Sequence, residues 1–357
     1  MHKILVVPLD WGLGHATRCI PIINGLLQQG YQVFIGAEGA QAALLQQAFP
    51  ALIILPIKGY HIQYSRNKWS MPIKILVQIP QIIRAIWHEQ QWLKDIVVKE
   101  QIDLVISDNR YGLYHASIPS IFITHQLTIK APFVWVENIL RRINYSFINR
   151  FTACWVPDMA MLPGVAGVLS HPLQMPAVPV LYLNLLSRFI SQPQPIKYSI
   201  CILLSGPEPQ RSILEEKLLS AIHQINEPVL LVRGKPLENT IPTVPLNVTA
   251  VNHLNTQQLG EAIQQSEYII CRSGYTTVME LLSLKKKMLV IPTPLQTEQE
   301  YIGEELMKSK LALCFHQESF NILTAYTQAK KFQYHNSNVV QFQETNIAQI
   351  IQQSLNI

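Results

Sequence analysis

Short apolar segments alternate with helical patterns along most of the chain, and this alternation constrains the fold more than any other feature. In the first half, the apolar segments are uninterrupted and lie at residues 3–9, 32–37, 103–107, 120–124 and 154–157. Uninterrupted apolar strands are typical of a parallel sheet whose two faces are both covered by helices. We therefore predict an α/β fold with a doubly wound parallel sheet.

The same alternation begins again after a proline-rich stretch, with apolar segments between residues 198 and 315. A chain of 357 residues is too long for one ordinary core, so we expect a second doubly wound domain. The sequence predicts an N-terminal domain over 1–165, a linker over 166–197 and a C-terminal domain over 198–341. A last amphipathic helix, within 342–357, either returns to the N-terminal domain or caps its own domain.

The composition argues against several classes of protein. Charged residues make up 14% of the chain, and the net charge of +5 is spread out, so nucleic acid is not an expected partner. The five cysteines form no C-x-x-C pair, which favours buried thiols in a reducing compartment over a metal site. The chain enters a strand at once and has no run of about 18 apolar residues. We expect a cytoplasmic protein without a signal peptide or a transmembrane helix.

Residues 271–280 form the clearest candidate for a binding site. An apolar strand leads into a helix there, and the backbone N–H groups and dipole at a helix start favour an anion such as phosphate. Glu280 on that helix can accept hydrogen bonds from two neighbouring hydroxyl groups, and a polar loop, 296–300, follows the next strand. The pattern predicts a site for a nucleotide sugar. Its candidate residues are Ser273, Gly274, Tyr275, Thr276, Glu280, Gln296, Gln299 and Glu300.

A second junction in the same half supports a diphosphate site. Ser205 and Gly206 follow the first strand of the predicted C-terminal domain, and Arg211 lies a few residues later. Backbone N–H groups of the first two and a bidentate contact from Arg211 would suit a diphosphate, with Arg272 as a further cation. The alternative is a proline-rich turn in which Ser212 caps the next helix.

The first strand of the chain ends in a glycine-containing loop with a histidine. Gly12 and Gly14 allow a tight turn, but Thr17 stands where a dinucleotide fingerprint has its third glycine, which disfavours NAD. His15 then lies at a helix start, where its neutral form is favoured and can act as a base. Asp108 ends another strand of the same domain and is a candidate to orient His15. The alternative is that Asp108 caps a helix and His15 bonds only to the backbone.

Two weaker candidates and one absence complete the pattern. His125 also follows a strand of the first domain and is a candidate contact for an acceptor, although such a histidine is more often structural. Residues 68–94 are basic, aromatic and apolar, which fits either a surface that leans into a membrane or an ordinary buried helix. The five aspartates form no D-x-D pair, so we expect no metal and no cofactor.

These residues resemble those of GT-B glycosyltransferases, and among them the peptidoglycan N-acetylglucosaminyltransferase family that forms lipid II. The likeness covers most of the chain and is most specific at 273–280 and 292–301. It implies two Rossmann-like domains that face a cleft, with Glu280 on the donor ribose and Gln299 and Glu300 on the donor sugar. It also implies Ser205 and Gly206 on the diphosphate. That family has two adjacent glutamines where this chain has Gln299 and Glu300, which leaves the sugar open.

The loop 12–19 also resembles that of the UDP-sugar hydrolase of pseudaminic acid synthesis, in which the histidine activates water. We therefore expect a metal-independent inverting glycosyltransferase of the cell envelope. It would use a nucleotide diphosphate sugar, with UDP favoured, and a hydroxyl acceptor such as a glycolipid at the inner face of the membrane. A nucleotide-sugar hydrolase that uses His15 is the first alternative, and a non-catalytic nucleotide-sugar or lipid-binding protein is the second.

Overall fold

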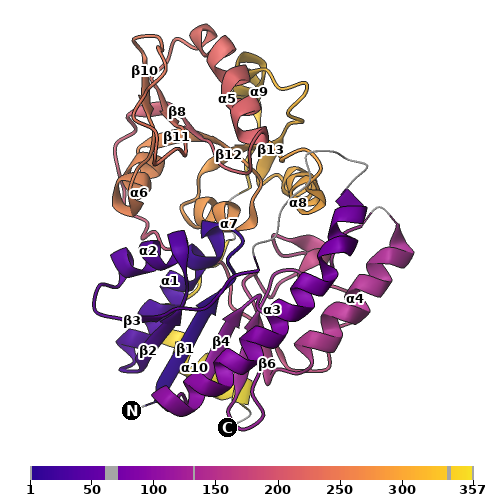
Figure 1. The fold of residues 1–357 in the computed structure, drawn as a ribbon. Coiled ribbons are helices and arrows are strands. Elements are labelled where there is room, and N and C mark those ends of the chain that lie inside the picture. The colour runs from indigo at the N-terminus through magenta and orange to yellow at the C-terminus, as the bar shows by residue number, and fades with distance from the viewer. Residues whose placement is uncertain (1, 61–70, 132, 336–338, 356–357) are drawn as a thin grey trace. The chain divides into compact units, whose positions relative to one another are not determined.

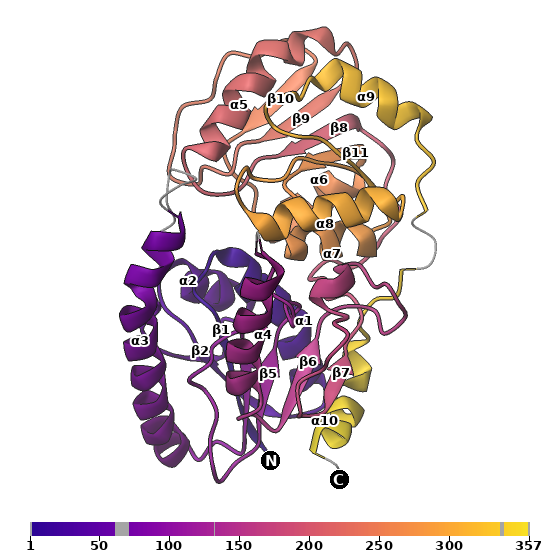
Figure 2. The same cartoon turned by 90° about the vertical axis from the view of Figure 1, so that its right-hand side faces the viewer.

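The structure, a computed structural model, describes residues 2–60, 71–131, 133–335 and 339–355. It divides into two compact units (Figures 1 and 2). Unit 1 contains Met1–Arg188 and Val340–Ile357, and unit 2 contains Phe189–Val339. Each unit has its own parallel sheet with helices on both faces, so the predicted doubly wound α/β fold is confirmed in both.

Unit 1 has a seven-stranded parallel sheet in the order β3-β2-β1-β4-β5-β6-β7. Its strands are β1 (Lys3–Pro8), β2 (Gln32–Gly36), β3 (Ile53–Leu55), β4 (Leu104–Asp108), β5 (Ser120–Ile123), β6 (Ala153–Val156) and β7 (Val180–Tyr182). Its helices are α1 (Leu13–Gln28), α2 (Gly39–Ala48), α3 (Met71–Glu100), α4 (Val134–Ile148) and α10 (Ile347–Leu355), with the short turns η2 (Gly167–Leu169) and η5 (Glu344–Asn346). The strands at the centre are buried along nearly their whole length, which explains their uninterrupted apolar sequence.

The last helix of the chain is part of unit 1 and packs against β6 and β7 at one end of its sheet (Figure 2). The indole Nε1 of Trp155 in β6 donates a hydrogen bond of 2.7 Å to the hydroxyl of Ser354 in α10. Neighbouring Cys154 points to the opposite face, into the cluster formed with α4. Gly25 lets η5 approach α1 closely, because a Cβ at that position would lie 2.7 Å from the carbonyl oxygen of Glu344.

Unit 2 has a six-stranded parallel sheet in the order β10-β9-β8-β11-β12-β13, which is the strand order of a Rossmann fold. Its strands are β8 (Tyr198–Leu203), β9 (Val229–Val232), β10 (Val248–Val251), β11 (Ser266–Cys271), β12 (Lys287–Val290) and β13 (Ala312–Cys314). Its helices are α5 (Gln210–Ala221), α6 (Thr256–Gln264), α7 (Tyr275–Ser283), α8 (Thr297–Lys308) and α9 (Ile322–Lys331), with the turn η3 (Ile222–Gln224). The order reverses between β8 and β11, and ligands bind at such a reversal in this class of sheet.

The proline-rich stretch that suggests a linker over 166–197 contains ordered parts of unit 1. The turn η2 and the edge strand β7 both fall within it. The carboxylate of buried Asp158 accepts hydrogen bonds from the backbone N–H groups of Val165 and Ala166, at 2.8 and 3.0 Å, and from the hydroxyl of Ser170. A buried carboxylate can therefore order a loop in which helical and strand periodicity are both missing.

Candidate functional site

In unit 1, the carboxyl ends of β1, β4 and β5 bring His15, Asp108 and His125 to one edge of the sheet. Gly12 has a φ of 80°, in the left-handed region that favours glycine, and it turns the chain from β1 into α1. Gly14 lies in the first turn of α1, directly before His15. Asp108 is the last residue of β4, and His125 follows β5. The tight turn and the shared strand edge explain why residues far apart in sequence meet here.

The imidazole of His15 and the carboxylate of Asp108 are in direct contact. Nδ1 of His15 lies 2.9 Å from Oδ2 of Asp108. The Asp108 side chain is fully buried, whereas 15% of the His15 side chain is exposed. One member of the pair is thus fixed in the core, while the other reaches the surface.

A buried arginine, Arg18, joins this pair to His125. Its Nε donates to Oδ1 and Oδ2 of Asp108, at 2.9 and 3.0 Å, and its Nη2 also donates to Oδ1. Nη1 of Arg18 lies 3.2 Å from Nδ1 of His125. The sequence interpretation gave Arg18 no role. A signal was present, because residues three apart share a helix face, which places Arg18 beside His15 on α1.

The charges in this cluster set the protonation of His15. Burial and the Arg18 guanidinium lower the pKa of His15, and they outweigh the Asp108 carboxylate, which raises it. Burial alone would raise the pKa of Asp108, but Arg18 and His15 hold it below its usual range. Asp108 is therefore ionised and His15 neutral near neutral pH, which is the state that a general base requires.

In unit 2, two buried polar atoms lie near Gly206 in the turn after β8. Within the described part of the chain, Nε of Arg272 and Oγ1 of Thr293 have no hydrogen-bond partner. A Cβ at Gly206, where φ is 102°, would lie 3.5 Å from Oγ1 of Thr293 and 3.9 Å from Nε of Arg272. The missing side chain of Gly206 thus leaves space beside two atoms that can donate hydrogen bonds. Sequence reasoning named Gly206 and Arg272 but missed Thr293, which lies three residues after the end of β12.

Arg272 is a buried cation held by carbonyl groups. Its Nη1 donates to the carbonyl oxygens of Ile291 and Pro292, at 3.1 and 3.2 Å, and its Nη2 donates to Oε1 of Gln317 at 2.6 Å. Burial lowers the pKa of Arg272 to about 10, so the side chain stays protonated at neutral pH. No carboxylate is among these partners, and an anion beside Nε would therefore be stabilised by an uncompensated positive charge.

The loop after β12 is shaped by Gln299 and Glu300, the two side chains that the family resemblance assigns to the donor sugar. Oε1 of Gln299 accepts the N–H of Thr293 at 2.9 Å, and Oε1 of Glu300 accepts the N–H of Leu295 at 3.0 Å. Nε2 of Gln299 donates to Oε1 of Gln296 at 2.5 Å. Gln299 and Glu300 hold the backbone of their own loop here, and a sugar contact from them remains a prediction.

The start of α7 joins this loop. Ser273 is fully buried and donates from its hydroxyl to the carbonyl oxygen of Gln299 at 2.7 Å. Gly274 precedes the first residue of α7 and provides no side-chain cap. Tyr275 is buried, Thr276 is half-buried, and Glu280 is 6% exposed. The helix start predicted to bind phosphate therefore lies at the carboxyl end of β11, with Ser273 positioning the loop beside it.

One predicted contact needs correction. The sequence predicts that Arg211 contacts the diphosphate together with Ser205 and Gly206. Ser205 is exposed in the structure. Instead, Nε and Nη1 of Arg211 donate to Glu208 and Glu215, at 2.6 and 3.0 Å, and Nη2 donates to the hydroxyl of Ser212 at 2.6 Å. The guanidinium is engaged at each nitrogen, so this structure favours a role in holding α5 over a phosphate contact.

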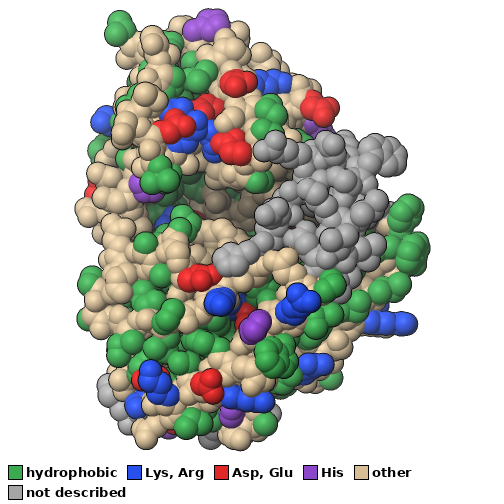
Figure 3. Space-filling model, in the orientation of Figure 1, with side chains coloured by type: hydrophobic (Ala, Val, Ile, Leu, Met, Phe, Trp, Pro, Cys, Tyr) green, Lys and Arg blue, Asp and Glu red, His purple; other side chains and the backbone are tan. Residues whose placement is uncertain are grey.

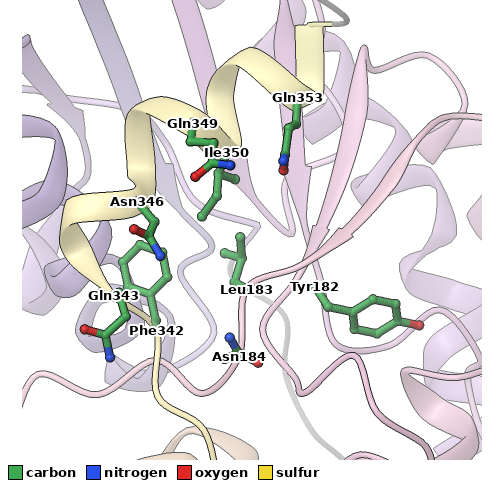
Figure 4. A pocket seen from close by; sticks show the side chains of 9 residues that line it. All are labelled: Tyr182, Leu183, Asn184, Phe342, Gln343, Asn346, Gln349, Ile350 and Gln353. Carbon is green, nitrogen blue, oxygen red and sulfur yellow. The ribbon is translucent and has the colours of Figure 1, made fainter.

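A separate pocket of about 200 Å³ lies in unit 1 and contains none of the predicted residues. It lies between β7 and the C-terminal segment, and amide side chains of that segment are among those that line it (Figure 4). Its lining residues are Tyr182, Leu183, Asn184, Phe342, Gln343, Asn346, Gln349, Ile350 and Gln353. The described residues contain no group of three or more His, Cys, Asp or Glu side chains that could hold a metal ion.

Comparison with known proteins gives matches over most of the chain. Residues 210–353 match the glycosyltransferase family 28 C-terminal domain. The chain is similar to an uncharacterized glycosyltransferase of Methanosarcina acetivorans, with 22% identity over 327 residues that cover 84% of this chain and 81% of the relative.

A second relative is the UDP-N-acetylglucosamine–N-acetylmuramyl-(pentapeptide) pyrophosphoryl-undecaprenol N-acetylglucosamine transferase of Pectobacterium carotovorum. It is 22% identical over 328 residues, which cover 90% of this chain and 84% of the relative. Among solved structures, the glycosyltransferase SnogD of Streptomyces nogalater has a TM-score of 0.67 at 13% identity and covers 99% of both chains.

Proposed function

We propose that this chain, a glycosyltransferase with the GT-B fold that uses a nucleotide-sugar donor, is a metal-independent inverting enzyme with His15 as its base. Unit 2, which contains most of the family 28 match, would hold the donor, and unit 1 would supply the base for a hydroxyl acceptor. UDP is the favoured nucleotide, because the Pectobacterium carotovorum relative carries UDP-N-acetylglucosamine in its name.

The single observation that carries the donor site is the pair of unsatisfied atoms beside Gly206. Buried polar groups are almost always hydrogen-bonded, so an unpartnered Nε of Arg272 and Oγ1 of Thr293 at one place favour a ligand there. Both atoms can donate hydrogen bonds, one from a cation, and phosphate oxygens accept such bonds. A diphosphate is the part of a nucleotide sugar that this chemistry fits.

The proposed reaction is one displacement at the anomeric carbon. The acceptor hydroxyl gives its proton to Nε2 of His15, its oxygen forms a bond to the anomeric carbon, and the bond from that carbon to the diphosphate breaks. The configuration inverts because a single attack occurs from the opposite side. Arg272, Thr293 and the N–H groups at the start of α7 would stabilise the negative charge that develops on the leaving diphosphate.

Two experiments test this proposal. Calorimetry with UDP, GDP and dTDP should show binding of at least one of them, and binding of none would refute the donor site. With an identified donor and acceptor, His15→Ala should lower kcat by about 100-fold or more while leaving the Kd for the nucleotide diphosphate unchanged. Near wild-type transfer by His15→Ala would refute the assignment of the base.

The hydrolase alternative differs in one measurable quantity. A hydrolase would release free sugar at a rate that no acceptor changes, whereas a transferase consumes donor faster when its acceptor is present. The comparisons do not favour the hydrolase, since the family match and both relatives are glycosyltransferases.

An exposed apolar stripe on α4 supports a further part of the proposal, contact with a lipid surface. Trp135, Ile139 and Ile143 recur every four residues along one face of α4 and are 64%, 47% and 50% exposed. Phe133 stacks near Trp135 at the start of the helix, and Arg142 is exposed beside the stripe. Hydrophobic and basic side chains gather at the right-hand edge of Figure 3, where α4 lies in Figure 1. An apolar face flanked by arginine fits a membrane surface with anionic lipids.

The stretch 68–94, for which the sequence suggests the same role, is only partly described. Residues 68–70 lie outside the described residues, while Ile83, Arg84 and Trp87 are exposed on α3. No described helix is long and apolar enough to cross a bilayer. We therefore propose that any membrane contact is peripheral, through the surface formed by the exposed residues of α3 and α4.

A further inference from the structure

The buried guanidinium of Arg18 contacts the carboxylate and both histidines of the unit 1 site, and nothing in the proposed reaction step uses it. It is 2% exposed. Its Nε and Nη2 donate to Asp108, and its Nη1 lies 3.2 Å from Nδ1 of His125. A guanidinium has five N–H donors, has no acceptor and cannot be deprotonated in a protein. The contacts of Arg18 therefore fix where hydrogens sit on its neighbours.

The first consequence concerns His15. Its Nδ1 lies 2.9 Å from Oδ2 of Asp108, and an ionised carboxylate can only accept. The hydrogen of a neutral His15 ring must then be on Nδ1. Nη2 of Arg18 also lies 2.9 Å from this nitrogen, and it carries two hydrogens. One of them goes to Oδ1 of Asp108, and the other cannot bond to an Nδ1 that already donates to the charged carboxylate. Nε2 of His15 is left with its lone pair and is the basic nitrogen.

The second consequence is the reverse for His125. Nη1 of Arg18 can only donate, so Nδ1 of His125 must accept, and the hydrogen of its neutral ring is on Nε2. His125 is 7% exposed. The thiol of Cys19 faces the same carboxylate at 3.9 Å and stays neutral, because burial raises its pKa well above the usual range. Cys19 is therefore not a second anion that competes with Asp108 for the hydrogens of Arg18.

We propose that Arg18 is a positioning residue that holds His15 and His125 in opposite neutral tautomers. His15 thereby offers a basic Nε2 and His125 offers an N–H donor, the two complementary groups that a hydroxyl needs when it gives up a proton while its oxygen remains hydrogen-bonded. The meaning of this arrangement for catalysis rests on the proposed function, but the tautomers themselves do not.

Long-range proton–nitrogen NMR spectra of the full chain, labelled with ¹⁵N-histidine, test the inference without any substrate. The resonances of the two rings are assigned with His15→Asn and His125→Asn. At a pH well above the ordinary histidine pKa, we expect the hydrogen on Nδ1 of His15 and on Nε2 of His125. The same tautomer on both rings, or rapid exchange between tautomers on either ring, would overturn the proposal in the wild-type protein itself.

Variants at Arg18 separate positioning from a merely structural role. Arg18→Lys keeps the charge, but a single ammonium group cannot reach Asp108 and His125 together. His125 should therefore lose its tautomer preference, while the pKa of His15 stays low. Arg18→Met removes the cation, and the pKa of His15 should rise under the influence of Asp108. Arg142→Lys, an exposed change on α4, is the matched control and should alter neither ring.

The outcomes distinguish this inference from the proposed function. Opposite tautomers in a protein that binds no nucleotide diphosphate would support the role of Arg18 and refute the donor site. Nucleotide binding with both rings in the same tautomer would support the donor site and refute the role of Arg18. An unchanged His125 tautomer in both Arg18 variants, with each still folded, would show that Arg18 does not set it and would refute the proposal.

Discussion

Replacement of Thr293 by valine should change stability and binding in opposite directions. Thr293 is 1% exposed, and its hydroxyl has no hydrogen-bond partner among the described residues. Valine has nearly the same shape and removes only the hydroxyl. A buried hydroxyl without a partner costs about 1–3 kcal/mol, so Thr293→Val should stabilise the ligand-free protein by about 1 kcal/mol or more. For a unit of this size, that corresponds to a rise in Tm of about 2–4 °C.

The same change should weaken binding of the nucleotide diphosphate. A hydrogen bond to a charged phosphate contributes about 1.5 kcal/mol or more, so its loss should raise Kd about tenfold. Calorimetry measures Kd for the nucleoside diphosphate and for the matching nucleoside, whose Kd should not change because it has no phosphate. Thermal unfolding of ligand-free protein measures stability. Thr249→Val, on the exposed side of β10, is the matched control for threonine to valine and should leave both quantities unchanged.

Two results would refute this reasoning. An unchanged Kd for the diphosphate, together with a raised Tm, would mean that the buried hydroxyl of Thr293 lacks a partner but does not contact the ligand. A lowered Tm would mean that the hydroxyl already has a partner in the folded protein. A second variant, Gly206→Ala, tests the same site from the other side. Its methyl group would lie 3.5 Å from Oγ1 of Thr293, in the space proposed for the diphosphate, and should also weaken diphosphate binding.

Three further outcomes are expected. Because burial and Arg18 lower the pKa of His15, the acidic limb of the pH profile of kcat/KM should lie below pH 6.5, and a limb above pH 6.5 would contradict this. The stability that the neutral ring contributes above its unfolded pKa should likewise be lost as the pH falls. Ser354→Ala should destabilise unit 1 by about 1–3 kcal/mol in urea unfolding, because the indole N–H of Trp155 loses its hydrogen-bond partner in the core. An unchanged urea midpoint would argue against the packing of α10 on β6. Trp135→Glu should reduce sedimentation with vesicles that contain phosphatidylglycerol, whereas Leu246→Glu, on an exposed loop of unit 2, should not; equal binding of both variants would argue against the α4 surface.

The sheets were predictable from sequence because burial on both faces leaves a clear pattern. Uninterrupted apolar runs mark the central strands, and their carboxyl ends locate His15, Asp108 and Ser273 without any contact being known. β7 was not predicted as a strand of the sheet. It has only three residues, and prolines surround it, so neither periodicity nor length distinguishes it from a connection.

The finer features of the site depend on side-chain directions that no local pattern encodes. Arg211 looks like a phosphate ligand from its position after a strand, yet Glu208 and Glu215 are close enough in sequence and space to bind it first. Thr293 has no charge and belongs to no motif, and it becomes notable only when its hydroxyl is found buried beside Gly206. Gln299 and Glu300 show the same limit, because their loop turns their oxygens back onto its own backbone.

The return of the C-terminal helix makes unit 1 a discontinuous domain, with consequences for how the chain folds during synthesis. All seven strands of its sheet are made before residue 189, but the helix that covers Trp155 is made only after the whole of unit 2. The nascent unit must therefore wait with the β6 and β7 part of its sheet uncovered on one side, which makes unit 2 the first of the two that can fold to completion. A shortened C-terminus should thus impair the half of the protein that contains the amino terminus and His15, and a chaperone that binds the nascent chain should recognise that uncovered face.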